Sequence, residues 1–217
     1  MKKNKIFSFK YLLHDFVRIT GIPGLIWFRP KKIYISERAK KKHKGGVLFI
    51  SNHNTLFDPM YIMLGIWYRR HHFVATKELF SNKFNKFLFT YPFICIPIDR
   101  ENFSFLTFKE IVNHLQNGEA VTMFPEGKVN EEDSGINKFK SGMIMMALKG
   151  GVPIVPLYIK RRKNIFSRLV IGVGEAVDVN KIHGKNDNSK PTLKDIDFLS
   201  EYLYEQEKRL EEIVEKR

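Results

Sequence analysis

The amino-acid sequence predicts a single α/β domain with a mainly parallel central sheet flanked by helices. From residue 45 onward, short, continuously apolar runs alternate with segments whose apolar residues recur at helical spacing. Continuously apolar strands are typical of parallel sheets that helices cover on both faces. The length of 217 residues and the 43% hydrophobic content also fit one ordinary domain. We find no internal repeat and no second domain.

The elements follow from this alternation, taken in chain order. Strands are expected over residues 47–51, 72–76, 93–98, 120–124, 153–159 and 168–173, with a further strand over 31–36. Helices are expected over 58–69, 78–90, 104–116 and 138–150. A last helix is expected from Leu193 to Glu215, because Thr192 and Asp195 resemble a capping box ahead of an apolar stripe. The polar stretch 180–190 is expected to be a loop.

The first 44 residues differ from the rest in charge. They carry thirteen Lys and Arg side chains against two acidic ones, so +11 of the formal net charge of +14 falls there. Residues 6–20 show helical spacing, and a Gly-Ile-Pro-Gly break precedes a second short helix that begins at Leu25. Such a basic, aromatic, amphipathic segment suits an anionic lipid surface. A solvated arm packed on the core, or a nucleic-acid-binding arm, has the same composition.

Several classes of protein are excluded. No apolar run reaches the ~18 residues of a membrane-spanning helix, polar residues interrupt any signal peptide, and lone Cys95 forms no internal disulfide. We therefore expect an intracellular chain that is not integral to a membrane. The sequence lacks G-x-S-x-G, a P-loop and a complete dinucleotide fingerprint. His71 and His72 with Cys95 match no usual zinc spacing, so no metal is expected.

His53 and Asp58 follow the strand over 47–51, where functional groups of open α/β sheets gather. Five residues apart, they would lie about 140° apart around a continuous helix. They meet only if the segment turns, with His53 in a loop and Asp58 near a helix start. Asp58 would then accept the imidazole N–H, leaving the other nitrogen to take a proton. Taken alone, the pair fits equally a helix-capping Asp beside a polar loop.

Three further segments favour a catalytic role for His53 and Asp58 over a capping role. In order, they are Ile98–Arg100, Phe124–Gly127 (F-P-E-G) and Val152–Pro156 (V-P-I-V-P). Together with N-H-x-x-x-x-D around His53, they resemble the four blocks of the glycerolipid acyltransferases, specifically the 1-acylglycerol-3-phosphate acyltransferase family. The resemblance covers about residues 47–175. It implies transfer of a fatty acyl group from acyl-CoA or acyl-carrier protein to a lysophospholipid hydroxyl, with 1-acyl-sn-glycerol-3-phosphate, giving phosphatidic acid, as the best guess.

The resemblance also implies roles for residues. His53 would be the general base and Asp58 would stabilise its imidazolium, with no cofactor and no metal because the thioester is already activated. Backbone N–H groups near the start of the next helix would hold the oxyanion. Arg100, Glu126 and Gly127 would contribute to the acceptor site, Arg100 as a phosphate clamp or, alternatively, in a salt bridge with Asp99.

One position departs from the family pattern. Many members carry Thr-Arg-Ser after F-P-E-G, whereas here Lys128 follows and supplies a charge one position early. The acceptor therefore stays open to another lysolipid or an amino-lipid.

With the family in view, we expect a peripheral enzyme on the cytoplasmic face of the membrane. Residues 1–44 would form a basic, aromatic membrane-docking segment and residues 45–217 the acyltransferase domain. The expected partners are a membrane lipid acceptor, acyl-CoA or acyl-carrier protein, and the membrane surface, but no nucleic acid. The rival hypotheses are a non-catalytic lipid- or nucleic-acid-binding protein and a hydrolase in which water replaces the lipid hydroxyl.

Overall fold

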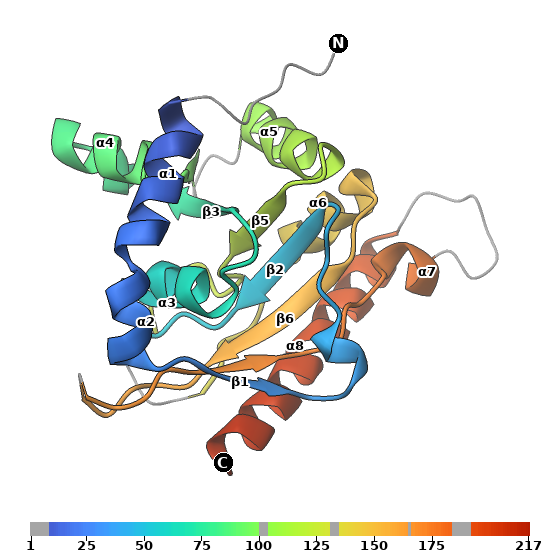
Figure 1. The fold of residues 1–217 in the computed structure, drawn as a ribbon. Helices are drawn as coiled ribbons and strands as arrows, with labels where there is room; N and C mark the ends of the chain where they lie inside the picture. Colours follow the sequence, from blue (N-terminus) through green and yellow to red (C-terminus); the bar gives the residue numbers. More distant parts are fainter. Residues whose placement is uncertain (1–8, 100–103, 131–134, 165, 184–191) are drawn as a thin grey trace.

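The protein is described by a computed structural model over residues 9–99, 104–130, 135–164, 166–183 and 192–217. Within these residues, seven strands form one sheet in the order β1-β7-β6-β2-β5-β3-β4 (Figure 1). All neighbouring pairs are parallel except β6 and β7, which are antiparallel. The strands are β1 (Lys31–Tyr34), β2 (Val47–Ser51), β3 (His71–Thr76), β4 (Ile96–Ile98), β5 (Ala120–Met123), β6 (Ile154–Ile159) and β7 (Val170–Val173).

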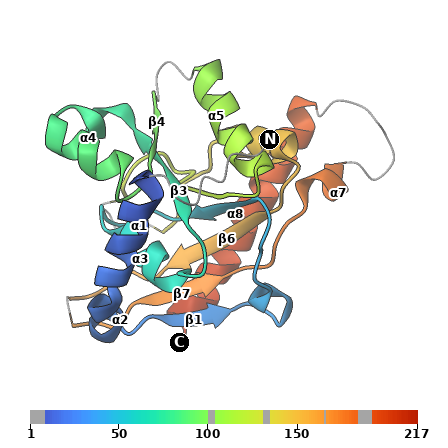
Figure 2. The same cartoon turned by 45° about the horizontal axis from the view of Figure 1, so that its top comes forward.

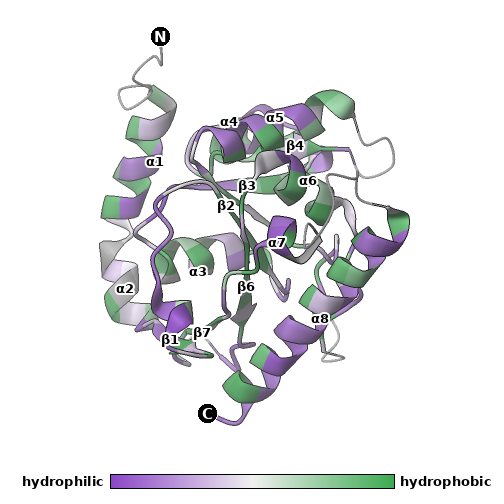
Figure 3. Ribbon diagram, turned by 90° about the vertical axis from the view of Figure 1, so that its right-hand side faces the viewer, coloured by the Kyte–Doolittle hydropathy of each residue, from purple (hydrophilic) through white to green (hydrophobic). Residues whose placement is uncertain are grey.

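Helices cover both faces of this sheet, as the apolar strands predicted. One face packs against α5 (Phe105–Gln116), α6 (Gly142–Gly150) and α8 (Leu193–Glu215), and the other against α3 (Asp58–Gly65). Figure 3 shows the sheet edge-on between these layers, with α1 (Phe9–Thr20) and α2 (Ile22–Phe28) beyond α3. At one end of the sheet, α4 (Lys83–Thr90) lies beside β4 (Figure 2).

Strand β2 lies at the centre of the core. All five of its residues are buried, and they alternate between the two faces of the sheet. Ile50 pairs with Met123 of β5 and with Pro156 of β6, so these parallel strands end at the same edge. The segments that follow β2, β5 and β6 are therefore brought together in space.

Most predicted elements are present, with shifted ends. The strand 47–51 and the helix 193–215 have the predicted bounds, and the capping box is formed: the N–H of Thr192 donates to Asp195 Oδ2 at 2.8 Å. The helix predicted over 78–90 is split, because the side chain of Asn82 caps a new helix, α4, after a 3₁₀ turn over Lys77–Phe80. The short helix α7 (Val179–His183) replaces the start of the predicted loop, and a 3₁₀ turn covers Arg38–Lys40.

Helix α1 presents an apolar face to solvent and a polar face to the core, which is the reverse of an ordinary surface helix. Its polar residues face the core: His14 is buried beside the carbonyl of Pro92, and Asp15 pairs with Arg70. Its outward side chains are large and apolar, namely Phe9, Leu12, Phe16 and Ile19. Among the described residues, no helix combines the length and the apolar character needed to cross a membrane.

Candidate active site

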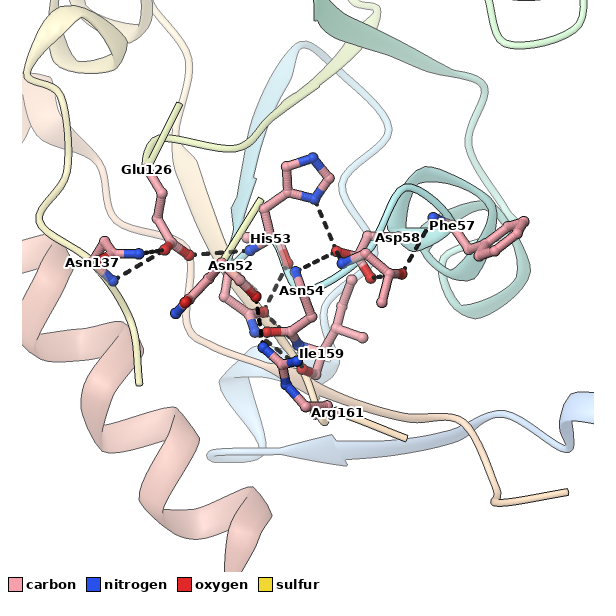
Figure 4. Close-up of polar contacts among 12 residues, drawn as sticks. Asn52, His53, Asn54, Phe57, Asp58, Glu126, Asn137, Ile159 and Arg161 are labelled. Atoms are coloured by element: carbon pink, nitrogen blue, oxygen red, sulfur yellow. Dashed lines mark hydrogen bonds and ion pairs between the residues drawn. The ribbon is translucent and has the colours of Figure 1, made fainter. Parts of the chain in front are cut away.

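The segment between β2 and α3 turns and brings His53 against Asp58. The distance from His53 Nδ1 to Asp58 Oδ2 is 2.9 Å (Figure 4). Asp58 is the first residue of α3 and is fully buried, whereas the His53 side chain keeps 13% of its surface exposed. Because a carboxylate only accepts, this contact requires a proton on Nδ1, and in the neutral ring Nε2 then presents a lone pair. The expected contact between the two residues is present, and the turn makes it possible.

The carboxylate of Asp58 also holds the loop that carries His53. Its Oδ2 accepts the backbone N–H of Asn54 at 2.6 Å and of Thr55 at 2.9 Å, and Oδ1 accepts the Thr55 hydroxyl at 3.0 Å. One buried side chain therefore fixes both the backbone of the loop and the plane of the imidazole. A neutral amide at position 58 offers one acceptor oxygen in place of two and cannot reproduce this pattern.

These hydrogen bonds narrow the set of N–H groups that could hold the oxyanion. The N–H groups of Asn54 and Thr55 donate to Asp58, that of Phe57 donates to Thr55 Oγ1 at 3.2 Å, and that of Asp58 donates to the Thr55 carbonyl at 3.2 Å. The N–H groups of these four residues are thus already engaged, and Pro59 has none. For the N–H groups of Leu56 and Met60, in contrast, no acceptor is found in the described part of the chain.

Glu126 lies behind the His53 loop rather than in an open groove. It is 6% exposed; Oε1 accepts the N–H of His53 at 3.1 Å, and Oε2 accepts the side chain of Asn137 at 2.8 Å and its N–H at 3.1 Å. Figure 4 shows the carboxylate between these two partners. These contacts position the His53 backbone, and the contribution of Glu126 to the acceptor site stays a prediction.

Gly127, Lys128 and Arg100 were the other predicted site residues. Gly127 has a φ of +75°, and a Cβ there would lie 3.1 Å from the Lys140 side chain, so the turn requires glycine. Lys128 is exposed after this turn. Arg100 lies outside the described residues. Its expected alternative partner, Asp99, forms an ion pair with Lys77.

Two contacts that the sequence analysis missed also fix the histidine. The ring of Phe124 stacks on that of His53, with centroids 4.1 Å apart and an angle of 15°. The carbonyl of His53 accepts the N–H of Asn130 at 2.6 Å, and the carbonyl of Asn130 accepts Arg161 Nη2 at 2.6 Å. The stack and the hydrogen bond together fix the position of the imidazole and of its backbone.

Asn52 and Asn54 tie the same loop to the end of β6. Both side chains donate to the carbonyl of Ile159, at 3.0 and 2.8 Å, and Asn52 Oδ1 accepts the N–H of Ile159 at 2.7 Å. The N-H-N pattern after a buried strand was visible in the sequence. Their contact with Ile159 could not be predicted, because the sequence did not show that β6 ends at the same edge as β2.

A cavity of about 620 Å³ lies beside this loop. Its lining includes Asn52, Asn54 and Asn130, with Glu211 and Glu215 of α8 and the basic run 160–163. Figure 4 shows the His53 ring directed away from Asn52 and Arg161, so the cavity adjoins the back of the loop.

The chain matches a known family over its central region. The acyltransferase family matches residues 32–160, which is more than half of the chain. The chain belongs to the acyltransferase family. The match includes the His53–Asp58 pair and the F-P-E-G turn.

Two curated relatives of this acyltransferase chain are 1-acyl-sn-glycerol-3-phosphate acyltransferases. That of Bacillus subtilis (strain 168) is 32% identical over 111 residues, covering 51% of this chain and 54% of that protein. That of Streptococcus pneumoniae (strain ATCC BAA-255 / R6) is 28% identical over 154 residues, covering 67% and 55%. The chain thus spans about half the length of the curated relatives it matches.

A solved structure shares the fold. The crystal structure of the 1-acyl-sn-glycerophosphate (LPA) acyltransferase PlsC from Thermotoga maritima superposes with a TM-score of 0.64 at 21% sequence identity. The superposition covers 98% of this chain and 84% of that one. The α/β architecture predicted from the sequence is therefore common to this chain and that crystal structure.

Proposed function

We propose that this acyltransferase moves a fatty acyl group from acyl-CoA or acyl-carrier protein to the free hydroxyl of a lysophospholipid. The preferred acceptor is 1-acyl-sn-glycerol-3-phosphate, and the product is phosphatidic acid. The observation that carries the proposal is the His53–Asp58 pair, 2.9 Å apart at the edge where β2, β5 and β6 end. The choice of acceptor draws on the names of the two curated relatives.

The geometry supports general-base catalysis by His53. Nε2 takes the proton of the acceptor hydroxyl as its oxygen attacks the thioester carbonyl. The tetrahedral intermediate then expels the thiolate, and the imidazolium returns the proton to that sulfur. The products are the acylated lipid and a free thiol, and no enzyme nucleophile is needed. Asp58 keeps the ring in the productive tautomer and stabilises the imidazolium between the two proton transfers.

The proposal also assigns two binding roles, one for the oxyanion and one for the acceptor phosphate. The N–H groups of Leu56 and Met60 are the candidate donors to the oxyanion, because those of Asn54, Thr55, Phe57 and Asp58 already have acceptors. Arg100 and Lys128 are the candidate ligands of the acceptor phosphate, with Glu126 and Gly127 shaping the turn from which Lys128 projects. A guanidinium forms two hydrogen bonds with a phosphate, whereas Lys128 offers a point charge.

The proposal includes docking on the cytoplasmic face of the membrane through residues 1–44. The outward apolar residues of α1 are 52–65% exposed, and α2 adds Ile26 and Trp27 at 77% and 54%. Phe166 of the β6–β7 connection contacts Trp27, and Leu56 and Phe57 are exposed in the catalytic loop. The described basic residues of this segment are Arg18, Arg29, Lys31, Lys32, Arg38, Lys40, Lys41, Lys42 and Lys44. Apolar anchors and adjacent cations suit an anionic bilayer.

The experiment is a panel of lysolipids offered with acyl-CoA or acyl-carrier protein, with products identified by mass spectrometry. We expect phosphatidic acid to form fastest, from 1-acyl-sn-glycerol-3-phosphate. Fatty acid released at the rate of thioester loss, with no acylated lipid, would identify a hydrolase and contradict the proposal. Faster acylation of another lysolipid would support acyl transfer but would contradict the choice of 1-acyl-sn-glycerol-3-phosphate as the preferred acceptor.

A further inference from the structure

A second group of reactive side chains lies at the opposite edge of the sheet from His53. His72 is the second residue of β3, and Glu119 directly precedes β5, so both lie where these parallel strands begin. His114 lies in the last turn of α5, which leads into β5. We call these three residues the His-His-Glu cluster. None of them contributes to the catalytic loop, which follows the end of β2.

The three side chains converge on one carboxylate oxygen. His72 Nε2 lies 3.4 Å from Glu119 Oε2, and His114 Nδ1 contacts the same oxygen. The two imidazole rings lie side by side, with centroids 4.1 Å apart. One ligand atom from each of the three residues lies within 4.8 Å of the other two. The cluster therefore presents two nitrogens and one oxygen to a common point.

We propose that His72, His114 and Glu119 bind a divalent transition-metal ion of the zinc class. Imidazole nitrogens suit zinc and its neighbours, and two His with one Glu is a known zinc set that leaves a position open for water. Two ligand atoms about 2.1 Å from a tetrahedral ion lie about 3.4 Å apart. The His72–Glu119 pair has this separation, 3.4 Å. His114 Nδ1, which contacts Glu119 Oε2, would move away from that oxygen on binding the ion.

Neighbouring side chains hold the carboxylate of the cluster and add a second one. The Tyr11 hydroxyl donates to Glu119 Oε1 at 3.2 Å and holds the carboxylate in place. A second carboxylate, Glu110, lies 4.0 Å from His114 Nε2. Of the four nearby cations, Arg70 is paired with Asp15, which reduces its repulsion of a metal ion, and Arg69 donates to the carbonyls of His43 and Gly118.

The site is open to solvent on one side. A cavity of about 580 Å³ is lined by His72 and Glu119 together with Tyr11, His43 and four basic residues, Lys42, Lys44, Arg69 and Arg70. It gives an entry path for the ion and room for water at the remaining positions. The bound ion would join β3, α5 and the start of β5 and, through Tyr11, would fasten α1 to them. Its expected effect is thus on stability, whereas acyl transfer takes place at the other edge.

The test uses the full chain, stripped with EDTA and titrated with Zn²⁺ and Co²⁺. We expect one Zn²⁺ per chain and, at a hundredfold excess over Kd, a rise in Tm of roughly 5–10 °C. Co²⁺ should give visible d–d bands of an ion with nitrogen ligands.

Variants assign the ligands. His114→Gln and Glu119→Gln, both at partly exposed positions, should lose the Tm rise and the Co²⁺ bands. His43→Gln, a histidine that lines the same cavity outside the cluster, should keep both. Absence of stoichiometric binding to the wild type would overturn the proposal, as would equal binding by all three variants. Loss of the ion in His53→Ala would also overturn it, because the ion would then sit in the catalytic loop.

Discussion

Helices α1 and α8 use the same helical periodicity in opposite ways. In α8, the apolar stripe faces the sheet: Leu199, Leu203, Leu210 and Val214 are all buried. In α1, the apolar stripe faces outward, and the inward face holds Tyr11, His14, Asp15 and Arg18. A periodic pattern therefore identifies a helix and its two faces, but it does not tell which face the core covers.

The difference has an energetic consequence. An apolar stripe that the core covers stabilises the fold, whereas an exposed one of this size is a patch that another apolar phase would cover. Polar side chains and hydrogen bonds hold α1 to the body of the protein, and close packing holds α8. The two helices should therefore respond to substitution in opposite ways.

The largest expected effect is on α8. Leu203→Ala removes a fully buried side chain and should lower the free energy of unfolding by about 2–5 kcal/mol in urea denaturation. Leu12→Ala on α1, where the side chain is 52% exposed, should change it by less than about 0.5 kcal/mol. Equal losses at the two positions would show that α1 packs as α8 does.

The next effect concerns vesicle binding. Phe16 on α1 and Phe198 on α8 are both 61% exposed, which makes them a matched pair. Phe16→Glu should weaken sedimentation with anionic vesicles roughly 10- to 100-fold, because burial of a Phe side chain contributes about 1.5–3 kcal/mol. Phe198→Glu should leave binding unchanged. Similar losses of vesicle binding in both variants would show that α1 and α8 contribute equally to it, which would contradict docking through α1.

A smaller effect is expected at the polar inner face of α1. Asp15→Asn removes the ion pair with Arg70, in which both side chains are about one-third exposed. The expected loss is about 0.5–1 kcal/mol in the free energy of unfolding, with faster proteolysis of α1. Asp197→Asn, at an exposed position of α8, is the matched control and should behave as the wild type.

The smallest effect is a change in the pH dependence of stability. Burial lowers the pKa of His14, against the opposing influence of the Pro92 carbonyl, with Arg18 and Arg70 lowering it further and Asp15 raising it. The unfolded chain therefore binds more protons than the folded chain just below the ordinary pKa of about 6.5. The stability contributed by neutral His14 is present above that pH and is lost as the pH falls. His14→Gln should flatten this slope in urea titrations between pH 7 and 5; an unchanged slope would contradict the assignment.

Much of this architecture could be predicted because it depends on local patterns. The continuous apolar run 47–51 predicts a strand buried on both faces, and the capping box at Thr192 marks the start of α8. The turn between His53 and Asp58 could be predicted as a requirement for their contact, since a continuous helix keeps them apart. In each case the deciding information lies within a few residues.

The rest depends on contacts between distant segments. Glu126 turns inward because its oxygens meet N–H groups of His53 and Asn137, which no spacing rule indicates. Glu207 interrupts the buried stripe of α8, and burial beside Glu126 raises its pKa well above the ordinary value. His72 was set aside as a metal ligand because its sequence neighbours offered no suitable set, whereas the fold places His114 beside it.

The role of His53, oriented by Asp58, as the general base of acyl transfer can be tested directly. The measurement compares phosphatidic acid formation from acyl-CoA and 1-acyl-sn-glycerol-3-phosphate by the wild type and His53→Ala. His43→Ala serves as the histidine control, and melting curves verify folding. We predict a loss of about 10²–10⁴-fold in kcat for His53→Ala and no change for the control. Wild-type turnover by folded His53→Ala would contradict this role.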